Sequence, residues 1–361
     1  MPTAVTYLLI LLAAILVVFV VLKRPIYEAM FFGYIVMIAV TNEWGNFFNY
    51  IFKASTNTLF YAIVVFLAAA QLFGGTKVID KVITIILSLV GRLRGGAGYV
   101  ALISSTFMGA LSGSGAGNVA ATGVFTIPTM KKSGFPSYLA ANVEMSASTM
   151  GNMIPPSGVI TAAFGVLAAV AGVEDYSMSD FWIVVWGIAL WFILQRAITL
   201  YVFCRKYKVL PMKKEDLPSF GEAFKAGWKE LMLAVIIFLP FFLDSKLKSG
   251  LFTRLLGSGA NNLSSCVLLF VPGLAALYVM LIARKNCDTS PKAVVDMFSK
   301  DVKAIVPVSA TIFFAYCISN LYSALDVGND LGAYVASWGL SHLALALLVP
   351  LFCALLGTIL P

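Results

Sequence analysis

The sequence predicts an all-α, polytopic membrane protein, and its composition, its long apolar runs and the positions of its charges favour this fold class. Of the 361 residues, 60% are hydrophobic and only 12% are charged, and the mean hydropathy is +0.92. A typical soluble domain carries about 25% charged residues, so this chain has too few polar side chains to cover a water-facing surface. The composition therefore argues against a soluble enzyme and against a disordered chain.

Seven apolar runs are candidates for membrane spans, because a helix needs about 20 mainly apolar residues to cross a bilayer. They cover residues 5–22, 29–40, 58–73, 181–203, 228–243, 263–283 and 304–321. Residues 78–93 differ, since basic residues flank this run and Asp80 lies near its start. That pattern predicts an amphipathic helix at the membrane interface, and residues 332–340 predict a weaker one.

The lysines and arginines indicate the topology, because cytoplasmic loops are enriched in them. If Lys23 and Arg24 lie in the cytoplasm, roughly twenty of the 25 basic residues fall on that side. This count requires residues 95–129 to enter the membrane and return, since Lys131 and Lys132 follow directly. A simple crossing would reverse every later loop. We therefore predict a re-entrant hairpin over residues 95–129.

Two segments have compositions that disfavour a continuous helix. Residues 108–118 hold four glycines and two serines, and each glycine costs a helix about 1 kcal/mol relative to alanine. Residues 146–157 contain the adjacent Pro155 and Pro156, which remove two helix donors. Both segments are predicted to be unwound backbone that lines a protein-enclosed or wet cavity at membrane depth. Secondary transporters build sites in this way, with helix N-termini facing an anion and freed carbonyls holding sodium.

A weak internal repeat supports the same interpretation. Residues 66–73, the amphipathic stretch after them and residues 108–114 are similar in outline to residues 314–321, 330–340 and 352–358. According to the topology from the basic residues, the two copies begin on opposite sides of the membrane, so we predict an inverted repeat. Paired broken segments in inverted repeats indicate a binding site near the middle of the membrane. The second copy lacks a return arm before Pro361, which predicts a C-terminally truncated sequence.

The motifs at the two broken segments are long and ordered. The run Gly-Ala-Leu-Ser-Gly-Ser-Gly-Ala-Gly-Asn-Val-Ala-Ala-Thr-Gly extends from Gly109 to Gly123, and the chain continues in register to Phe135. The run Ala-Ser-Thr-Met-Gly-Asn-Met-Ile-Pro-Pro-Ser follows from Ala147 to Ser157. Together they resemble the large (M-type) membrane subunit of tripartite ATP-independent periplasmic, or TRAP, transporters. The close resemblance covers residues 92–158, and the order of spans fits the whole chain.

The resemblance implies an elevator-type secondary transporter, in which a scaffold holds a mobile transport domain of re-entrant hairpins and broken helices. It implies a small (Q-type) membrane subunit and a periplasmic solute-binding protein as partners. Sodium is the implied coupling ion, the solute is an organic acid such as a dicarboxylate or sialic acid, and the location is the bacterial inner membrane. No organic cofactor is expected. Two features depart from the family pattern: the final hairpin is cut short, and residues 113–117 are richer in glycine.

The resulting domain prediction has five parts. Residues 1–76 hold N-terminal scaffold spans, 77–94 an interfacial helix, and 95–172 the first hairpin and broken helix of the transport domain. Residues 173–289 hold further scaffold spans with a connecting cytoplasmic loop. Residues 290–361 begin the second, incomplete repeat.

The predicted site residues lie at the two breaks and at the mirrored tip of the second repeat. The expected sodium ligands are Ser112, Gly113, Ser114, Thr149 and Gly357. The expected solute-binding residues are Asn118, Ser148, Asn152 and Thr358, while Pro155 and Pro156 shape the helix break. The alternatives are close packing of the small residues, satisfaction of freed backbone groups by the hydroxyls, and a helix-capping role for Asn118.

Two charged residues lie within apolar segments. A carboxylate buried in a membrane is costly and often functional, so Glu144 is either a proton or cation site or is solvated at the nearby interface. Arg196 is expected to extend to the cytoplasmic edge. The five scattered cysteines and the single histidine, His342, match no zinc or disulfide pattern.

No nucleophile–base pair or Walker motif is visible, so neither hydrolysis nor ATP drive is supported. The predicted function is the membrane permease subunit of a sodium-coupled, binding-protein-dependent importer of an organic acid. Three alternatives stay open: a stand-alone ion-coupled carboxylate carrier of the same superfamily, an intramembrane enzyme or channel, and a non-functional fragment.

Overall fold

The computed structural model describes residues 3–76, 78–112, 115–155, 157–167, 176–213, 215, 217–257, 259–284, 287–288 and 290–359. The regular elements of this part of the chain are all helices, which agrees with the predicted all-α class. The chain divides into two compact units, and we describe each by itself. Unit 1 consists of Met1–Phe60 with Lys303–Pro361, and unit 2 consists of Tyr61–Val302.

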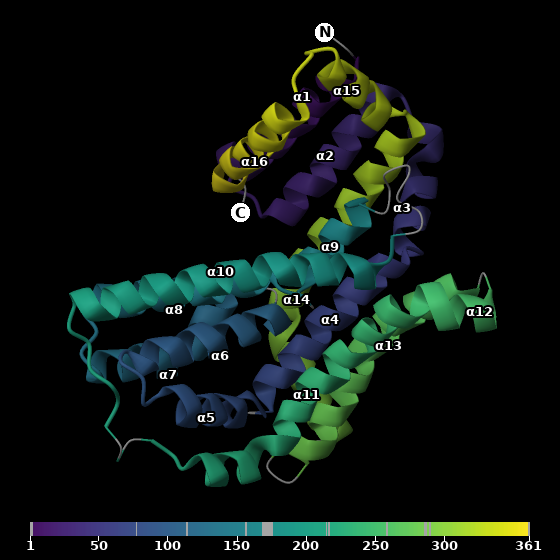
Figure 1. The fold of residues 1–361 in the computed structure, drawn as a ribbon. Helices are drawn as coiled ribbons and strands as arrows, with labels where there is room; N and C mark the ends of the chain where they lie inside the picture. Colours follow the sequence, from purple (N-terminus) through teal and green to yellow (C-terminus); the bar gives the residue numbers. More distant parts are fainter. Residues whose placement is uncertain are drawn as a thin grey trace. The chain divides into compact units, whose positions relative to one another are not determined.

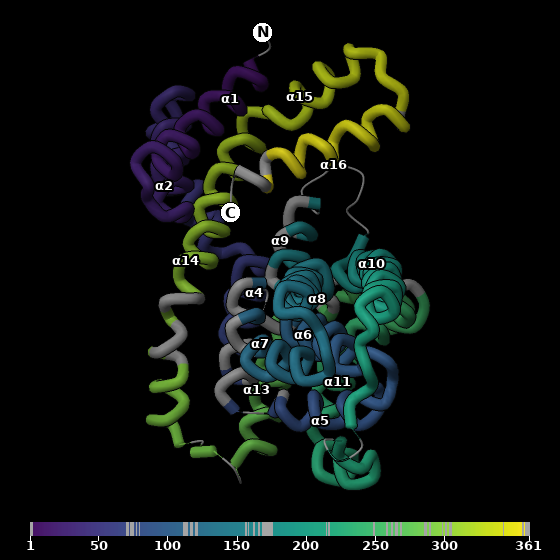
Figure 2. The backbone as a smooth tube through the Cα atoms, turned by 90° about the vertical axis from the view of Figure 1, so that its left-hand side faces the viewer, coloured from purple at the N-terminus to yellow at the C-terminus, as the bar shows by residue number. Residues whose placement is uncertain are grey.

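Unit 1 combines helices from both ends of the sequence (Figure 2). The N-terminal ones are α1 (Thr3–Leu16), continued by a π-helical turn at Val17–Val21, α2 (Ile26–Thr41), a 3-10 turn at Trp44–Asn46, and α3 (Phe47–Ser55). The C-terminal ones are the end of α14 (Pro291–Ala324), α15 (Val327–Ala336) and α16 (His342–Ile359). Asn42 ends α2 in the left-handed conformation (φ 57°), a frequent way for a helix to stop.

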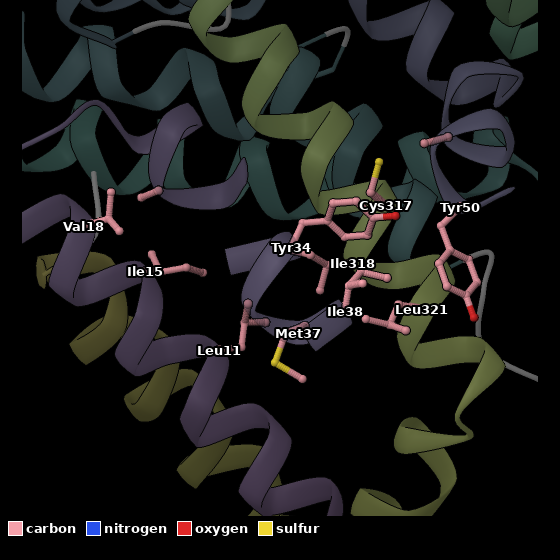
Figure 3. Close-up of a cluster of buried hydrophobic side chains, with 12 residues drawn as sticks. Leu11, Ile15, Val18, Tyr34, Met37, Ile38, Tyr50, Cys317, Ile318 and Leu321 are labelled. Carbon is pink, nitrogen blue, oxygen red and sulfur yellow. The ribbon is translucent and has the colours of Figure 1, made fainter. Parts of the chain in front are cut away.

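The core of unit 1 is apolar. Side chains from α1, α2, α3 and α14 converge there, including the fully buried Tyr34, Met37, Ile38 and Leu321 (Figure 3). The Tyr34 hydroxyl donates to the Phe47 carbonyl at 2.6 Å, which satisfies its polar end. Helices in a membrane associate through such close van der Waals packing, and here it joins residues nearly 300 positions apart in the sequence.

Unit 2 contains most of α4 and the helices that follow it in the sequence as far as α13, which are labelled in Figure 1. These are α4 (Thr58–Gly75), α5 (Val78–Val90), α6 (Gly96–Ser112), α7 (Gly115–Lys132), α8 (Ser137–Met150), the 3-10 turn η3 (Gly151–Met153), α9 (Gly158–Leu167), α10 (Met178–Lys206), α11 (Phe220–Leu247), the π-helical turn η5 (Lys248–Phe252), α12 (Thr253–Leu256) and α13 (Gly259–Ala283). The first residues of α14 also belong to this unit.

Both ends of α10 are specified by the sequence. Ser177 and Asp180 form a capping box at its N-terminus. Arg205 and Lys206 lie in its last turn, where positive charge complements the helix dipole. A helix of 29 residues is about 43 Å long at 1.5 Å per residue, which is enough to cross a hydrocarbon core of about 30 Å.

Among the described residues, four helices are long and apolar enough to cross a membrane, by length and composition. They are Thr3–Val21, Met178–Lys206, Phe220–Leu247 and Ile305–Ala324, and they coincide with four predicted spans. The pair Trp44–Ser55 and Thr58–Ala69, bent by 51°, adds a fifth if it is one broken span. The predicted runs at 29–40 and 263–283 fall on the shorter apolar helices Ile26–Thr41 and Leu269–Ala283.

The predicted amphipathic helix forms as α5 and packs on α11. Gly227 allows the close approach, because a Cβ at this position would lie 2.9 Å from Ile85 Cδ1. Beside this contact, Lys81 Nζ pairs with Glu230 Oε1 at 2.6 Å, and the Glu230 side chain is only 5% exposed. The ion pair therefore adds to the packing of α5 on α11.

Candidate functional site

Helices α6, α7 and α8 lie side by side in unit 2 (Figures 1 and 2). Four of the predicted site residues lie on them: Ser112, Asn118, Ser148 and Thr149. α6 and α7 form a helical hairpin in the predicted region. Near the start of α7, Asn118 Nδ2 donates to the Ser105 carbonyl of α6 at 2.5 Å, and Ser105 Oγ lies 3.0 Å from Thr122 Oγ1. Residues 113–114, which come between the two helices in the sequence, lie outside the described residues.

The prediction that residues 108–118 are unwound is wrong for the described part of this segment. α6 stays helical to Ser112, and α7 is helical from Gly115. Gly109 serves close packing instead, because a Cβ on it would lie 2.8 Å from Gly151 Cα and 2.8 Å from the Ser148 carbonyl oxygen. Close contact between small residues outweighs their low helix propensity.

The second predicted break exists but is shorter than predicted. α8 stays helical through Met150, so the prediction is wrong for residues 146–150. The chain then tightens into η3, and Ile154 is extended (φ −119°, ψ 128°) before Pro155. This follows from the restriction that a proline places on the residue before it. Pro156 lies outside the described residues.

Two buried amide oxygens lie at these paired segments without a hydrogen-bond partner among the described residues. They are Asn118 Oδ1 and Asn152 Oδ1, and Asn118 is only 1% exposed. A Cβ on Gly115, the first residue of α7, would lie 3.2 Å from Thr149 Cγ2 and 3.7 Å from Asn152 Nδ2. The start of α7 therefore faces the end of α8, and the structure brings the two motif segments together.

The other predicted site residues are placed as follows. Ser148 is buried and donates from Oγ to Glu144 Oε1 at 3.0 Å. Thr149 is exposed, and its hydroxyl donates to the Met145 carbonyl at 3.0 Å, as in the alternative where hydroxyls satisfy backbone groups. Gly113, Ser114 and the side chains of Ser112 and Thr358 lie outside the described residues, while Gly357 is an exposed residue of α16 in unit 1.

Glu144 is completely buried between α6, α7 and α8, so its solvation at an interface is ruled out. Its carboxylate accepts hydrogen bonds from four hydroxyls, those of Ser105, Thr122, Thr126 and Ser148. The sequence carried a signal for this arrangement. Thr122 and Thr126 are four residues apart, as are Glu144 and Ser148, so each pair lies on one helix face.

Arg196 does not simply extend to the cytoplasmic edge as predicted. Its Nε donates to Ser146 Oγ of α8 at 3.0 Å, and it lines a cavity of about 410 Å³ between α6, α8 and α10. The Arg196 side chain is half-buried, so its guanidinium forms a hydrogen bond with the neighbouring helix α8.

The donor atoms of the site are neutral oxygens and one carboxylate. Among the described residues no group of three or more His, Cys, Asp or Glu side chains could hold a metal ion. Hydroxyl, amide and carbonyl oxygens suit hard cations and hydrogen-bonding solutes, and they carry no covalent chemistry by themselves.

An all-helical membrane protein that collects buried oxygens where a hairpin meets a broken helix belongs to the class of transport proteins by architecture. Comparison with known families makes this specific. Residues 5–361 match the family model described as "Tripartite ATP-independent periplasmic transporter, DctM component", and the chain belongs to this family. It is therefore a multi-pass membrane protein of a family of transporter permease subunits, which are not enzymes. This confirms the resemblance carried by the motifs.

Curated relatives agree with the family. The chain is 25% identical over 310 residues to the "C4-dicarboxylate TRAP transporter large permease protein DctM" of Pseudomonas aeruginosa, covering 85% of this chain and 66% of the relative. It is 28% identical over 194 residues to the "2,3-diketo-L-gulonate TRAP transporter large permease protein YiaN" of Escherichia coli, covering 53% and 42%. It is 35% identical over 107 residues to the "Isethionate TRAP transporter permease protein DctMQ" of Oleidesulfovibrio alaskensis, covering 30% and 17%. The chain thus covers less than two thirds of each relative's length.

Proposed function

We propose that this chain is the membrane permease subunit of a sodium-coupled, binding-protein-dependent importer of an organic acid in the bacterial inner membrane. Membership of the family supports the permease role. The names of the relatives support the solute class, because C4-dicarboxylates, 2,3-diketo-L-gulonate and isethionate are all small organic anions. The elevator mechanism remains part of the proposal.

The observation that carries the coupling proposal is the pair of unpartnered amide oxygens, Asn118 Oδ1 and Asn152 Oδ1. A buried acceptor without a donor costs about 1–3 kcal/mol, so it is retained where a ligand satisfies it. An organic anion brings mainly acceptors, whereas an amide oxygen needs a donor or a cation. A sodium ion at the contact of α7 and η3 would meet this need.

The start of α7 supports the placement of the solute. Its first N–H groups have no partner within the helix, and the dipole makes this end positive. Gly115 begins the helix and is buried beside Thr149. A solute carboxylate is therefore expected at this terminus, next to the cation that accompanies it.

The proposed partners are a small Q-type membrane subunit and a periplasmic solute-binding protein. The tripartite description of the family supports a system of more than one component.

The proposal is tested in proteoliposomes that contain the full-length permease and small subunit, with the binding protein outside and radiolabelled succinate as the probe. We expect uptake to require an inward sodium gradient and the binding protein. Uptake that is indifferent to sodium contradicts the coupling, and uptake without the binding protein favours the stand-alone carrier.

Two matched asparagine variants locate the sodium site. Asn152→Ala removes an unpartnered buried oxygen, so we expect the sodium concentration for half-maximal uptake to rise about tenfold, as the loss of about 1.4 kcal/mol of binding would cause. Asn142→Ala changes an exposed residue of α8 and should leave this concentration unchanged. Equal effects of the two variants would contradict the placement.

A further inference from the structure

We propose that Glu144 is a proton-binding site of this transporter, and that it exchanges its proton with water in a pocket between α5, α6 and α7. The physiological role of the site rests on the proposed transport function. The site itself is distinct from the amide oxygens proposed for sodium, and it can be tested without transport.

Glu144 has no counter-ion in the part of the chain that the structure describes. The carboxylate is completely buried, and among the described residues no basic side chain forms an ion pair with it. Four hydroxyls from three helices take the place of a cation, with Ser105 Oγ 2.8 Å from Oε1 and Thr126 Oγ1 2.5 Å from Oε2. Because an isolated buried charge is very costly, this group is one that a proton can neutralise.

Two of the four hydroxyls around Glu144, those of Thr122 and Thr126, have second acceptors, so the neutral acid can also be satisfied. Thr122 Oγ1 lies 2.8 Å from the Asn118 carbonyl, and Thr126 Oγ1 lies 3.0 Å from the Thr122 carbonyl. When Glu144 takes a proton, these hydroxyl hydrogens can turn to the carbonyls. The new O–H of the acid then donates to a freed hydroxyl oxygen. Both protonation states therefore leave the buried groups paired.

The spacing of the oxygens favours a proton over a metal ion. The carboxylate and hydroxyl oxygens of this cluster are in direct hydrogen-bonding contact, and the Ser105 and Ser148 distances are 2.8 and 3.0 Å. An ion seated between these oxygens would have to separate them. A proton binds to the carboxylate without enlarging the cluster.

A pocket connects this cluster with the neighbourhood of α5. Its volume is about 270 Å³, and its lining includes Asp80, Thr84, Thr126 and Thr129. A water molecule occupies about 30 Å³ of liquid, so the pocket has room for several. Thr126 lines it and donates to Glu144. A proton from pocket water can therefore bind Thr126 Oγ1 while the hydroxyl proton moves to Glu144 Oε2, and the reverse transfer returns it to water.

Few other titratable groups of the described residues face this path. On α5, Asp80 lines the pocket, while Lys81 is paired with Glu230 of α11. On α6, the Tyr99 hydroxyl donates to the Ala197 carbonyl. Lys131 and Lys132 are exposed at the end of α7, and Arg196 of α10 is bonded to Ser146 of α8. Asp80 is thus the group from which Glu144 has to be separated experimentally.

Infrared difference spectroscopy on the full-length permease with its small subunit in nanodiscs tests the site directly. We expect a pH step to change a carboxylic-acid C=O stretching band that Glu144→Gln removes and Asp80→Asn retains. Absence of a band specific to Glu144 overturns the proposal. So does a Glu144 band that responds to sodium at constant pH and not to pH.

Two threonine variants test the route and do not depend on the folding of Glu144→Gln. Thr126→Val removes the hydroxyl between the pocket and Glu144, and we expect the band to respond at least tenfold more slowly after a pH jump. Thr129→Val is the matched control, because Thr129 lines the same pocket and its hydroxyl donates to the Phe125 carbonyl. Equal rates in the two variants overturn the route.

Transport gives the physiological readout. In the sodium-driven assay, wild-type uptake should vary with pH, and Glu144→Gln should lose this variation while Asp80→Asn keeps it. A pH profile that Glu144→Gln leaves unchanged overturns the role of Glu144 in transport. If the wild-type system takes up no solute, the proposed transport function is contradicted. The infrared experiment alone then tests whether Glu144 binds a proton.

Discussion

The core of unit 1 and the α6–α8 bundle of unit 2 are both closely packed, but by different means. In unit 1, large apolar side chains such as Met37, Ile38 and Leu321 fill the core. In the bundle, Gly109 and Gly151 bring backbones into contact, and hydroxyls surround the buried Glu144.

This difference concerns the positions of the polar side chains in the two units. Apolar packing is sufficient to associate helices, and polar groups in a membrane interior are costly unless each is paired. Unit 1 has a polar contact at a helix end, between Glu43 and Asn46, a contact between Tyr322 and the Tyr7 carbonyl of α1, and two buried hydroxyls without a partner among the described residues, those of Ser309 and Tyr316. The bundle concentrates polar contacts in its centre, together with two amide oxygens that lack partners among the described residues.

The largest expected effect comes from adding a methyl group where the backbones of the bundle touch. In Gly151→Ala the new Cβ would collide with Gly109 Cα and with the amide nitrogen of Ala110. Because backbone cannot yield as a flexible side chain does, we expect a loss of about 3 kcal/mol or more in the free energy of unfolding. Unfolding in mixed lipid–detergent micelles measures it. The control Gly187→Ala, which meets nothing within 4 Å in α10, should be neutral or slightly stabilising. Equal stability of both variants would refute the backbone contact.

In unit 1 the corresponding prediction concerns volume. Leu321→Ala leaves a cavity at a fully buried position, which should cost about 3 kcal/mol in the same measurement. Leu347→Ala, at a side chain that is 68% exposed on α16, should cost far less. If the two substitutions have the same effect, Leu321 does not lie in a packed core, and the contrast with the bundle fails.

A smaller effect is expected where α5 meets α11. Lys81→Met leaves the nearly buried Glu230 carboxylate without its cation. Breaking a buried pair costs about 3–5 kcal/mol, and the exposure of Lys81, 38%, reduces the expected loss to about 2 kcal/mol. The double variant with Glu230→Leu removes the stranded charge as well, so we expect it to recover most of the loss. A double variant as unstable as the single one would mean that the ion pair is not the cause.

Much of this fold follows from the sequence, because long apolar runs and caps act locally. The span at 181–203 and the start of α10 at Ser177 and Asp180 are examples, since a capping box is readable from the order of residues. The break at Pro155 is equally local. The helicity of residues 108–112 and 115–118 was missed, because it depends on a tertiary contact between Gly109 and Gly151 that glycine propensity does not include.

The candidate site could be predicted only in part from the sequence, because it too depends on tertiary contacts. Composition and motif placed Asn118 and Asn152 at paired segments, and the structure brings these segments together. The surroundings of Glu144 were not predicted, because three of its four donors come from α6 and α7, up to 39 residues away in the sequence. Hydroxyl spacing marks a helix face, but only the packing of three helices decides that the faces meet at one carboxylate.

The smallest effect expected concerns the polar contact at the edge of unit 1. Hydrogen bonds from the Asn46 side chain (2.8 Å) and the Tyr50 hydroxyl (3.0 Å) lower the pKa of Glu43. A carboxyl whose pKa is lower in the folded state stabilises the fold above its unfolded pKa of about 4.3, and this contribution is lost as the pH falls through the folded value. Glu43→Gln should therefore lower the melting temperature slightly at about pH 6 and have a smaller effect at about pH 3. An equal shift at both pH values would mean that the Glu43 charge contributes nothing. Because this contact lies at the surface, its loss should leave the apolar core of unit 1 intact, whereas a comparable loss inside the α6–α8 bundle would remove a partner of Glu144.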